Sequence, residues 1–220
     1  MRFTAKAMVV VVVCLGMVVL PARADIIVFD NTSTATGVTI PFGPSTAPPN
    51  EYGDAVYLAG TAREVTSLSV KVYSETSATI PSIVAHLWAN DGGLNEYGDA
   101  VPGTLLASST RLNVDLLAGI NTVTFDFESV TVPTYLTWGL ESRSPENYVT
   151  FGPTTYDPPT VGSNTARDYV WVLIGSSPPW IEAWWGGSDF GAVIAATAVP
   201  EPATLSLLAL GGLALIRRRR

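Results

Sequence analysis

Short runs in which apolar and polar residues alternate, each bounded by turn-forming residues, dominate the chain between Asp25 and Val199. Alternation with a period of two is typical of half-buried β-strands, because successive side chains point to opposite faces. Leu68–Val72 and Val123–Phe127 alternate most regularly. Further strands are predicted at Ile26–Phe29, Ile83–Trp88, Leu105–Leu112, Tyr135–Leu140, Tyr148–Phe151, Tyr169–Ile174 and Ala192–Ala198.

No stretch of residues 25–199 shows sustained helical periodicity, and its 16 glycines and 13 prolines suit a fold with many turns. These 175 residues are enough to bury a core. About nine or ten short strands without a helix predict an all-β fold, a single antiparallel β-sandwich of jelly-roll-like type. An N-terminal signal helix and a C-terminal hydrophobic helix are expected to flank this ectodomain.

The N-terminus has the three parts of a secretory signal peptide. Arg2 and Lys6 form a basic start, an apolar run follows, and Ala22 and Ala24 complete an A-x-A cleavage signal. The apolar run is too short for a permanent spanning helix, which needs about 20 residues. We therefore expect signal peptidase to remove residues 1–24 during export.

The C-terminal segment, residues 200–220, combines a proline-rich motif, a short apolar run and a basic end. The motif consists of Pro200, Glu201 and Pro202, whose prolines keep the chain extended before a helix. Ala203–Ile216 would form a helix of about 21 Å, short for a hydrocarbon layer of about 30 Å. Such a helix predicts a temporary membrane anchor. The cationic residues that would hold this end in the cytoplasm are Arg217, Arg218, Arg219 and Arg220.

This order of motif, helix and arginine cluster resembles the tail of PEP-CTERM sorted proteins. The resemblance implies processing near Pro200–Pro202 by an exosortase, an integral membrane cysteine transpeptidase of Gram-negative-type bacteria that make exopolysaccharide. It also implies export through the inner membrane, transient membrane contact, and a final place at the cell envelope, at the cell surface or outside the cell.

The ectodomain is similar to the choice-anchor domains of bacterial surface proteins, which carry one of several alternative anchoring tails. The similarity is carried by Phe29–Asn31, Gly53–Arg63, Asn90–Gly92, Pro102–Gly103 and Pro158–Ser163. These domains have no established catalytic activity, so the resemblance implies a surface context and no reaction.

Composition excludes several kinds of function. Residues 25–199 carry five basic and 18 acidic residues, a net charge of −13 that repels phosphate backbones, so no nucleic-acid partner is expected. Cys14 lies in the signal peptide, which leaves the mature chain without a thiol. His86, the one histidine, lies in an alternating run and is interpreted as structural. We therefore predict a protein that is not an enzyme.

A polar segment after the run at 83–88 offers oxygen ligands to a hard cation such as Ca²⁺. The same composition is ordinary turn chemistry, so a plain loop without any cofactor is the alternative. The candidate ligands are Asn90, Asp91, Asn95, Glu96 and Asp99.

Three tryptophans fall within six residues in a segment bounded by proline and glycine, which is predicted to be a loop. Trp180, Trp184 and Trp185 could form an aromatic platform that stacks on sugar rings. They could instead cap one end of the sandwich and bury their apolar area.

These features predict an exported, exosortase-processed surface or extracellular-matrix protein with a structural or adhesive role in the envelope or exopolysaccharide layer. The alternative is a carbohydrate-binding module that uses the tryptophan segment. A glycoside-active enzyme is a third hypothesis, which would require two carboxylates facing each other across a cleft.

Overall fold

Strands are the regular secondary structure in the part of the chain that the structure describes. The computed structural model describes residues 24–42, 50–95, 97–142, 150–156, 158–164, 169–174, 180–184 and 189–197. Every regular element in these ranges is a β-strand, so the predicted all-β class is confirmed. The predicted signal helix and C-terminal helix lie outside the described residues.

The first sheet contains seven strands, and all its pairings are antiparallel. Five strands form its main path and two more pair with members of that path. In spatial order the path is β1 (Asp25–Asp30), β14 (Ala192–Thr197), β4 (Glu64–Ser74), β9 (Phe151–Tyr156) and β13 (Asp189–Phe190). The two additional strands are β2 (Ala35–Thr39), which pairs with β9, and β7 (Gly119–Thr131), which pairs with β4.

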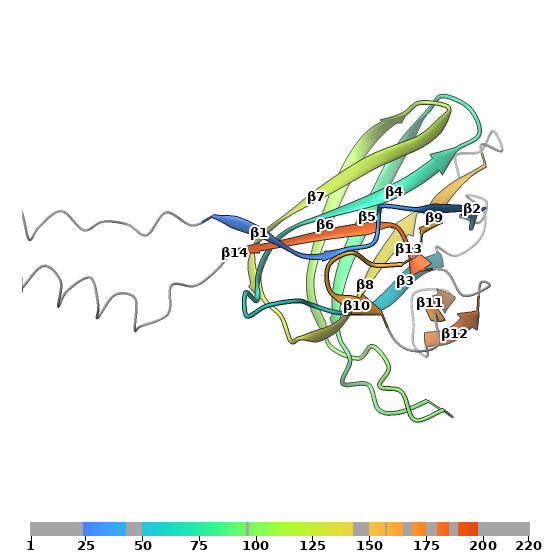
Figure 1. The fold of residues 1–220 in the computed structure, drawn as a ribbon. Helices are drawn as coiled ribbons and strands as arrows, with labels where there is room; N and C mark the ends of the chain where they lie inside the picture. The colour runs from blue at the N-terminus through green and yellow to red at the C-terminus, as the bar shows by residue number, and fades with distance from the viewer. Residues whose placement is uncertain are drawn as a thin grey trace, which may run out of the picture. The chain divides into compact units, whose positions relative to one another are not determined.

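The second sheet also contains seven strands in antiparallel pairs. In spatial order its path is β12 (Trp180–Trp184), β11 (Tyr169–Ile174), β3 (Asn50–Tyr57), β8 (Tyr135–Ser142), β5 (Ala78–Ala89) and β6 (Leu105–Leu116). The short strand β10 (Ser163–Asn164) pairs with β3. A tight connection between β6 and β7 carries the chain from this sheet to the first (Figure 1).

The core lies between the two sheets and is built from alternate residues of their strands. On β4 of the first sheet, Leu68 and Val70 are fully buried, and on β5 of the second sheet Ile83 and Leu87 are too. Trp138 on β8 is the largest of the fully buried side chains. Two facing sheets with a shared apolar interior are a β-sandwich, as the sequence predicts.

Two observed strands differ from what the sequence predicts. Of the strand predicted at Tyr148–Phe151, Tyr148 and Val149 lie outside the described residues, Phe151 begins β9, and the rest of β9 is not predicted. All six residues of β9 are buried, so its sequence lacks the alternation that marks a half-buried strand. The segment predicted as a tryptophan loop contains β12, whose backbone pairs along Trp180–Trp184 with β11.

Candidate ligand-binding face

The face of the second sheet that points away from the core carries a cluster of ionisable side chains. The register pairs Glu51 of β3 with Glu141 of β8, and His86 of β5 with Gly139 of β8. Residues paired across strands share a face, and so do residues two positions apart. Leu140, between Gly139 and Glu141, points into the core, so the three polar side chains lie together on the opposite, outer face.

Glu51 is buried although it lies on the outer face. Its side chain is 1% exposed, because the carboxylate folds down over Gly139 on the neighbouring strand. A Cβ atom at position 139 would overlap Oε1 of Glu51, so only glycine leaves this space. The indole Nε1 of Trp88 donates a hydrogen bond of 2.8 Å to Oε1. The second oxygen, Oε2, is buried and has no hydrogen-bond partner among the described residues.

The imidazole of His86 completes a charged pair with this carboxylate. Its Nδ1 lies 3.0 Å from Oε1 of Glu51, and its ring meets Trp88 edge to face at a centroid distance of 5.8 Å. Burial lowers the pKa of His86, but a hydrogen bond with Glu51 and the negative charges of Glu51 and Glu141 outweigh burial. The pKa of His86 is therefore raised above its usual value, which favours the imidazolium.

Three potential metal ligands come together here. One ligand atom each from Glu51, His86 and Glu141 lies within 4.8 Å of the other two. The sequence predicts a structural role for His86 and contains no pattern that singles out Glu51 or Glu141 beside it. No local signal could have joined them, because each comes from a different strand and only the register of the sheet brings them together.

Aromatic side chains extend this face along the strands. Tyr57 of β3 and Tyr135 of β8 are paired in register, and their rings stack at 4.4 Å with an interplanar angle of 18°. Tyr57 is 40% exposed. Trp88 occupies the same face, two residues beyond His86. The face thus carries aromatic rings, with Tyr57 exposed, at one end and a partly buried charged cluster at the other.

The predicted tryptophan segment forms the edge of the same sheet. In the backbone register, Trp180 of β12 pairs with Leu173 of β11, and Leu173 pairs with Glu51 of β3. Trp184 pairs with Tyr169 at the other end of β11. The positions of Trp180 and Trp184 are thus one strand beyond β11 in the sheet that holds the charged cluster. Trp185 lies outside the described residues.

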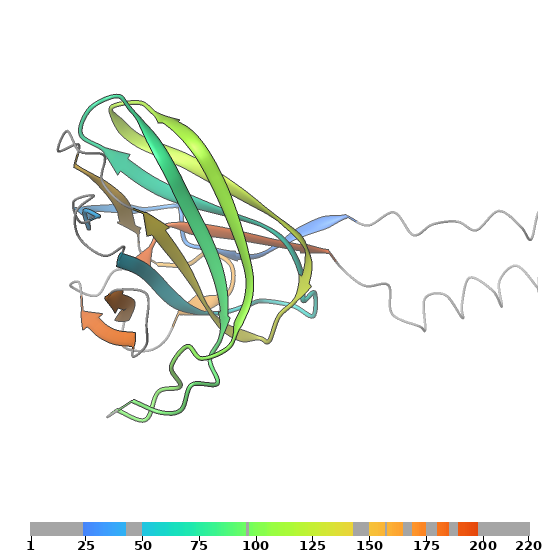
Figure 2. The same ribbon diagram turned by 180° about the vertical axis from the view of Figure 1, so that it is seen from behind.

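The segment between β5 and β6, which holds the predicted calcium ligands, projects from the sandwich in both views (Figures 1 and 2). Both oxygens of Asp91 are engaged there: Oδ1 accepts the backbone N–H of Thr104 at 2.6 Å, and Oδ2 accepts its hydroxyl at 2.7 Å. The hydroxyl and then the backbone hydrogen bond from Thr104 lower the pKa of Asp91. Asp91 therefore joins the start of this segment to its end at Thr104.

Asn95 and Asn90 make similar internal contacts. The side-chain oxygen of Asn95 accepts the backbone N–H groups of Tyr97 and Asp99, an arrangement typical of asparagine in turns. The side-chain oxygen of Asn90 accepts the hydroxyl of Thr137. Glu96 lies outside the described residues. These contacts match the plain-loop alternative, and calcium binding remains a prediction from the sequence.

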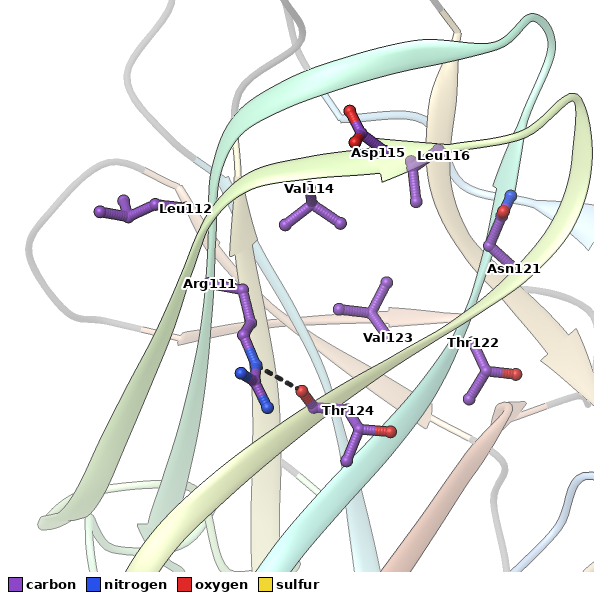
Figure 3. A pocket seen from close by; sticks show the side chains of 9 residues that line it. All are labelled: Arg111, Leu112, Val114, Asp115, Leu116, Asn121, Thr122, Val123 and Thr124. Carbon is purple, nitrogen blue, oxygen red and sulfur yellow. Dashed lines mark hydrogen bonds between the residues drawn. The ribbon is translucent and has the colours of Figure 1, made fainter.

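A shallow hollow of about 310 Å³ lies where β6 and β7 diverge (Figure 3). Arg111 projects across it from β6, and its Nε donates a hydrogen bond of 2.7 Å to the backbone oxygen of Thr124 on β7. The same guanidinium pairs with Asp126. Arg111 therefore ties the two sheets together at this edge.

Comparison with known families identifies the end of the chain. Residues 198–220 match the family model of the PEP-CTERM protein-sorting motif. The chain therefore carries the sorting signal of an exported, exosortase-sorted surface protein, and the predicted PEP-CTERM tail is confirmed. No curated protein and no solved structure matches the chain. Similarity to the choice-anchor domains remains a prediction.

The described residues contain no helix that is long and apolar enough to cross a membrane. The apolar run of the sorting tail lies outside the described residues.

Proposed function

We propose that this exported protein is a non-enzymatic, adhesive component of the exopolysaccharide layer and that it contacts polysaccharide through the outer face of its second sheet. The observation that carries the proposal is the stacked pair Tyr57 and Tyr135, with Tyr57 40% exposed. Aromatic rings on a surface offer apolar faces to the C–H groups of sugar rings, and nearby polar groups can bind the hydroxyls.

The charge of the ectodomain favours one class of polysaccharide. Residues 25–199 carry a net charge of −13, so a polyanionic polymer would be repelled. A neutral or amino-sugar polymer would not meet this barrier. We therefore expect the protein to bind neutral or cationic polysaccharides in preference to acidic ones.

The arrangement of the ends of the sandwich suits display on a surface. Asp25 at the start of β1 is paired in register with Thr197 at the end of β14, so both ends of the ectodomain leave at the same end of the first sheet (Figure 1). The sorting motif begins at residue 198, directly after β14. The connection to the tail is thus made through the first sheet, and the outer face of the second sheet belongs to other strands.

The test measures binding of the full chain to polysaccharides of the exporting bacterium. Affinity electrophoresis in gels that contain the polymer reports the binding as a loss of mobility. We expect the double variant Tyr57→Ala/Tyr135→Ala to bind at least about tenfold more weakly than the wild type. Tyr97→Ala, which removes a 50% exposed ring outside this face, is the matched control and should bind normally. Equal binding by all three proteins would refute the proposed face.

The same samples test whether the protein is an enzyme. Incubation with the bound polysaccharide should release no new reducing ends. Release that is lost in Glu51→Gln or Glu141→Gln would instead support the glycoside-active hypothesis, because hydrolysis of a glycosidic bond needs a pair of carboxylates.

The tryptophan segment is a second candidate contact, because β12 is an edge strand of the same sheet. Replacing Trp184 and Trp185 with alanine separates its two interpretations. Loss of polysaccharide binding with an unchanged melting temperature would indicate an aromatic platform. A large fall in melting temperature would indicate rings that cap the sandwich, at about 3–5 kcal/mol for each fully buried tryptophan. We expect the fall.

A further inference from the structure

We infer that Glu51, His86 and Glu141 form a binding site for a divalent transition-metal ion on the outer face of the second sheet. The inference does not depend on polysaccharide binding, because it concerns different residues and a different ligand. It also gives a function to the buried carboxylate of Glu51, whose Oε2 has no hydrogen-bond partner among the described residues.

The arrangement of the three side chains is the first argument. They come from the adjacent strands β3, β5 and β8, and their ligand atoms lie within 4.8 Å of one another. Strands inside a sheet are rigid supports, which hold ligands more accurately than a loop would. Zn²⁺ binds nitrogen and oxygen ligands at about 2.0–2.2 Å, so two of its ligand atoms lie roughly 3.4 Å apart. Three ligand atoms that lie within 4.8 Å of one another approach this spacing.

The state of Glu51 is the second and independent argument. The residue is 1% exposed, yet Oε2 has no hydrogen-bond partner among the described residues. A buried carboxylate oxygen without a partner is costly, and such groups in proteins are normally paired or coordinate a metal. Trp88 donates to Oε1 and so leaves Oε2 as the oxygen to which an ion can bind.

Supporting contacts around the ligands resemble those of metal sites. The hydrogen bond from Trp88 fixes the orientation of the Glu51 carboxylate, the task of the outer groups that orient metal ligands. Gly139 provides the space in which this carboxylate lies. Glu141 is only partly buried, so its carboxylate is accessible to an ion from the solvent.

The types of ligand select the class of ion. An imidazole together with carboxylates suits Zn²⁺ and its neighbours in the first transition series, whereas Ca²⁺ and Mg²⁺ prefer oxygen ligands alone. Three protein ligands leave a fourth position of a tetrahedral ion for water or for a group from another molecule. The structure thus points to an ion with one open position.

The experiment is calorimetric titration of Zn²⁺ into the full chain, purified in detergent and stripped with a chelator. We expect one site, which a tenfold excess of Ca²⁺ or Mg²⁺ does not block. His86→Gln and Glu141→Gln should each weaken binding at least about tenfold. Glu128→Gln, which removes an exposed carboxylate from β7 of the other sheet, is the matched control and should bind as the wild type does.

Glu51→Gln changes a buried residue and could unfold the protein, so the inference is tested on the two more accessible ligands, with circular dichroism to verify the fold. Three results would overturn it. The first is a wild type that binds no Zn²⁺. The second is wild-type affinity in both His86→Gln and Glu141→Gln when these variants are folded. The third is displacement of Zn²⁺ by Ca²⁺ at equal concentration. A Zn²⁺-induced rise in melting temperature in the wild type and the Glu128→Gln control, absent from the two ligand variants, is the supporting second readout.

Discussion

Trp88 of β5 donates its indole N–H to Oε1 of Glu51 on β3 at 2.8 Å, across 37 positions of sequence and over the intervening strand β8. The acceptor is 1% exposed, so this contact neutralises part of the cost of keeping a carboxylate out of water. The same oxygen faces His86 at 3.0 Å. An indole, an imidazole and a glutamate thus form one hydrogen-bonded unit on the outer face of the second sheet.

Trp88→Phe tests the energetic value of this contact. The substitution keeps an aromatic ring but leaves Glu51 without one of its donors. We expect the free energy of unfolding to fall by about 1–3 kcal/mol, the cost of a missing hydrogen bond to a charged group. Urea denaturation measures the change. Tyr73→Phe on the first sheet is the control, with an expected change within about 0.5 kcal/mol; equal effects of the two substitutions would contradict the importance of the contact.

Gly139→Ala tests the close approach of the Glu51 carboxylate to the backbone of β8. The new methyl group would overlap Oε1, so either the carboxylate or the strand must move. We expect a loss of about 1–3 kcal/mol, in the range of overpacked sites. The control is a double-mutant cycle with Glu51→Ala, in which the methyl group meets no carboxylate. Strictly additive effects would show that the overlap is not the cause.

The hydrogen bonds from Thr104 to Asp91, which join the two ends of the segment between β5 and β6, should be lost in acid. Hydrogen bonds from Thr104 lower the pKa of Asp91 below its usual value of about 3.9. A carboxyl whose pKa is lowered by folding contributes stability above its unfolded pKa, and the contribution is lost as the pH falls through the folded pKa. We therefore expect the amide resonance of Thr104 to shift with a midpoint below that of an ordinary aspartate.

Thr104→Val gives this titration its control. The substitution removes the hydroxyl, the larger of the two contributions to the lowered pKa, and retains the backbone N–H. The midpoint of the Asp91 titration, followed by nuclear magnetic resonance, should rise toward the ordinary value. An unchanged midpoint would mean that the hydroxyl does not stabilise the carboxylate.

The strands of the sandwich could largely be predicted from the sequence because alternation is a local property. The runs at Leu68–Val72 and Val123–Phe127 lie inside β4 and β7, and Tyr169–Ile174 coincides with β11. Where burial on both faces removed the alternation, as in β9, the prediction failed. Pro178 and Pro179 before Trp180 favoured a loop, although the tryptophan segment pairs as β12.

A repeated heptapeptide shows why the candidate site could not be predicted. Residues 50–56 and 95–101 have the same sequence, Asn-Glu-Tyr-Gly-Asp-Ala-Val. The first copy lies in β3 and buries Glu51 beside β8, whereas the second belongs to a projecting loop in which Gly98 adopts a φ of 85°. The two copies differ in structure because they have different neighbouring strands. Strand pairing depends on residues outside the heptapeptide, so the seven residues alone could not predict it.

The most direct test of the account is the intact mass of the protein isolated from a native host that has an exosortase. The sorting motif at residues 198–220 and the signal peptide predict a chain that begins at Asp25 and lacks Arg217–Arg220. Deletion of the exosortase should restore the C-terminal arginines. A mature protein that keeps Arg220 in the presence of the exosortase would contradict the central claim that this chain is sorted to the surface by cleavage of its tail.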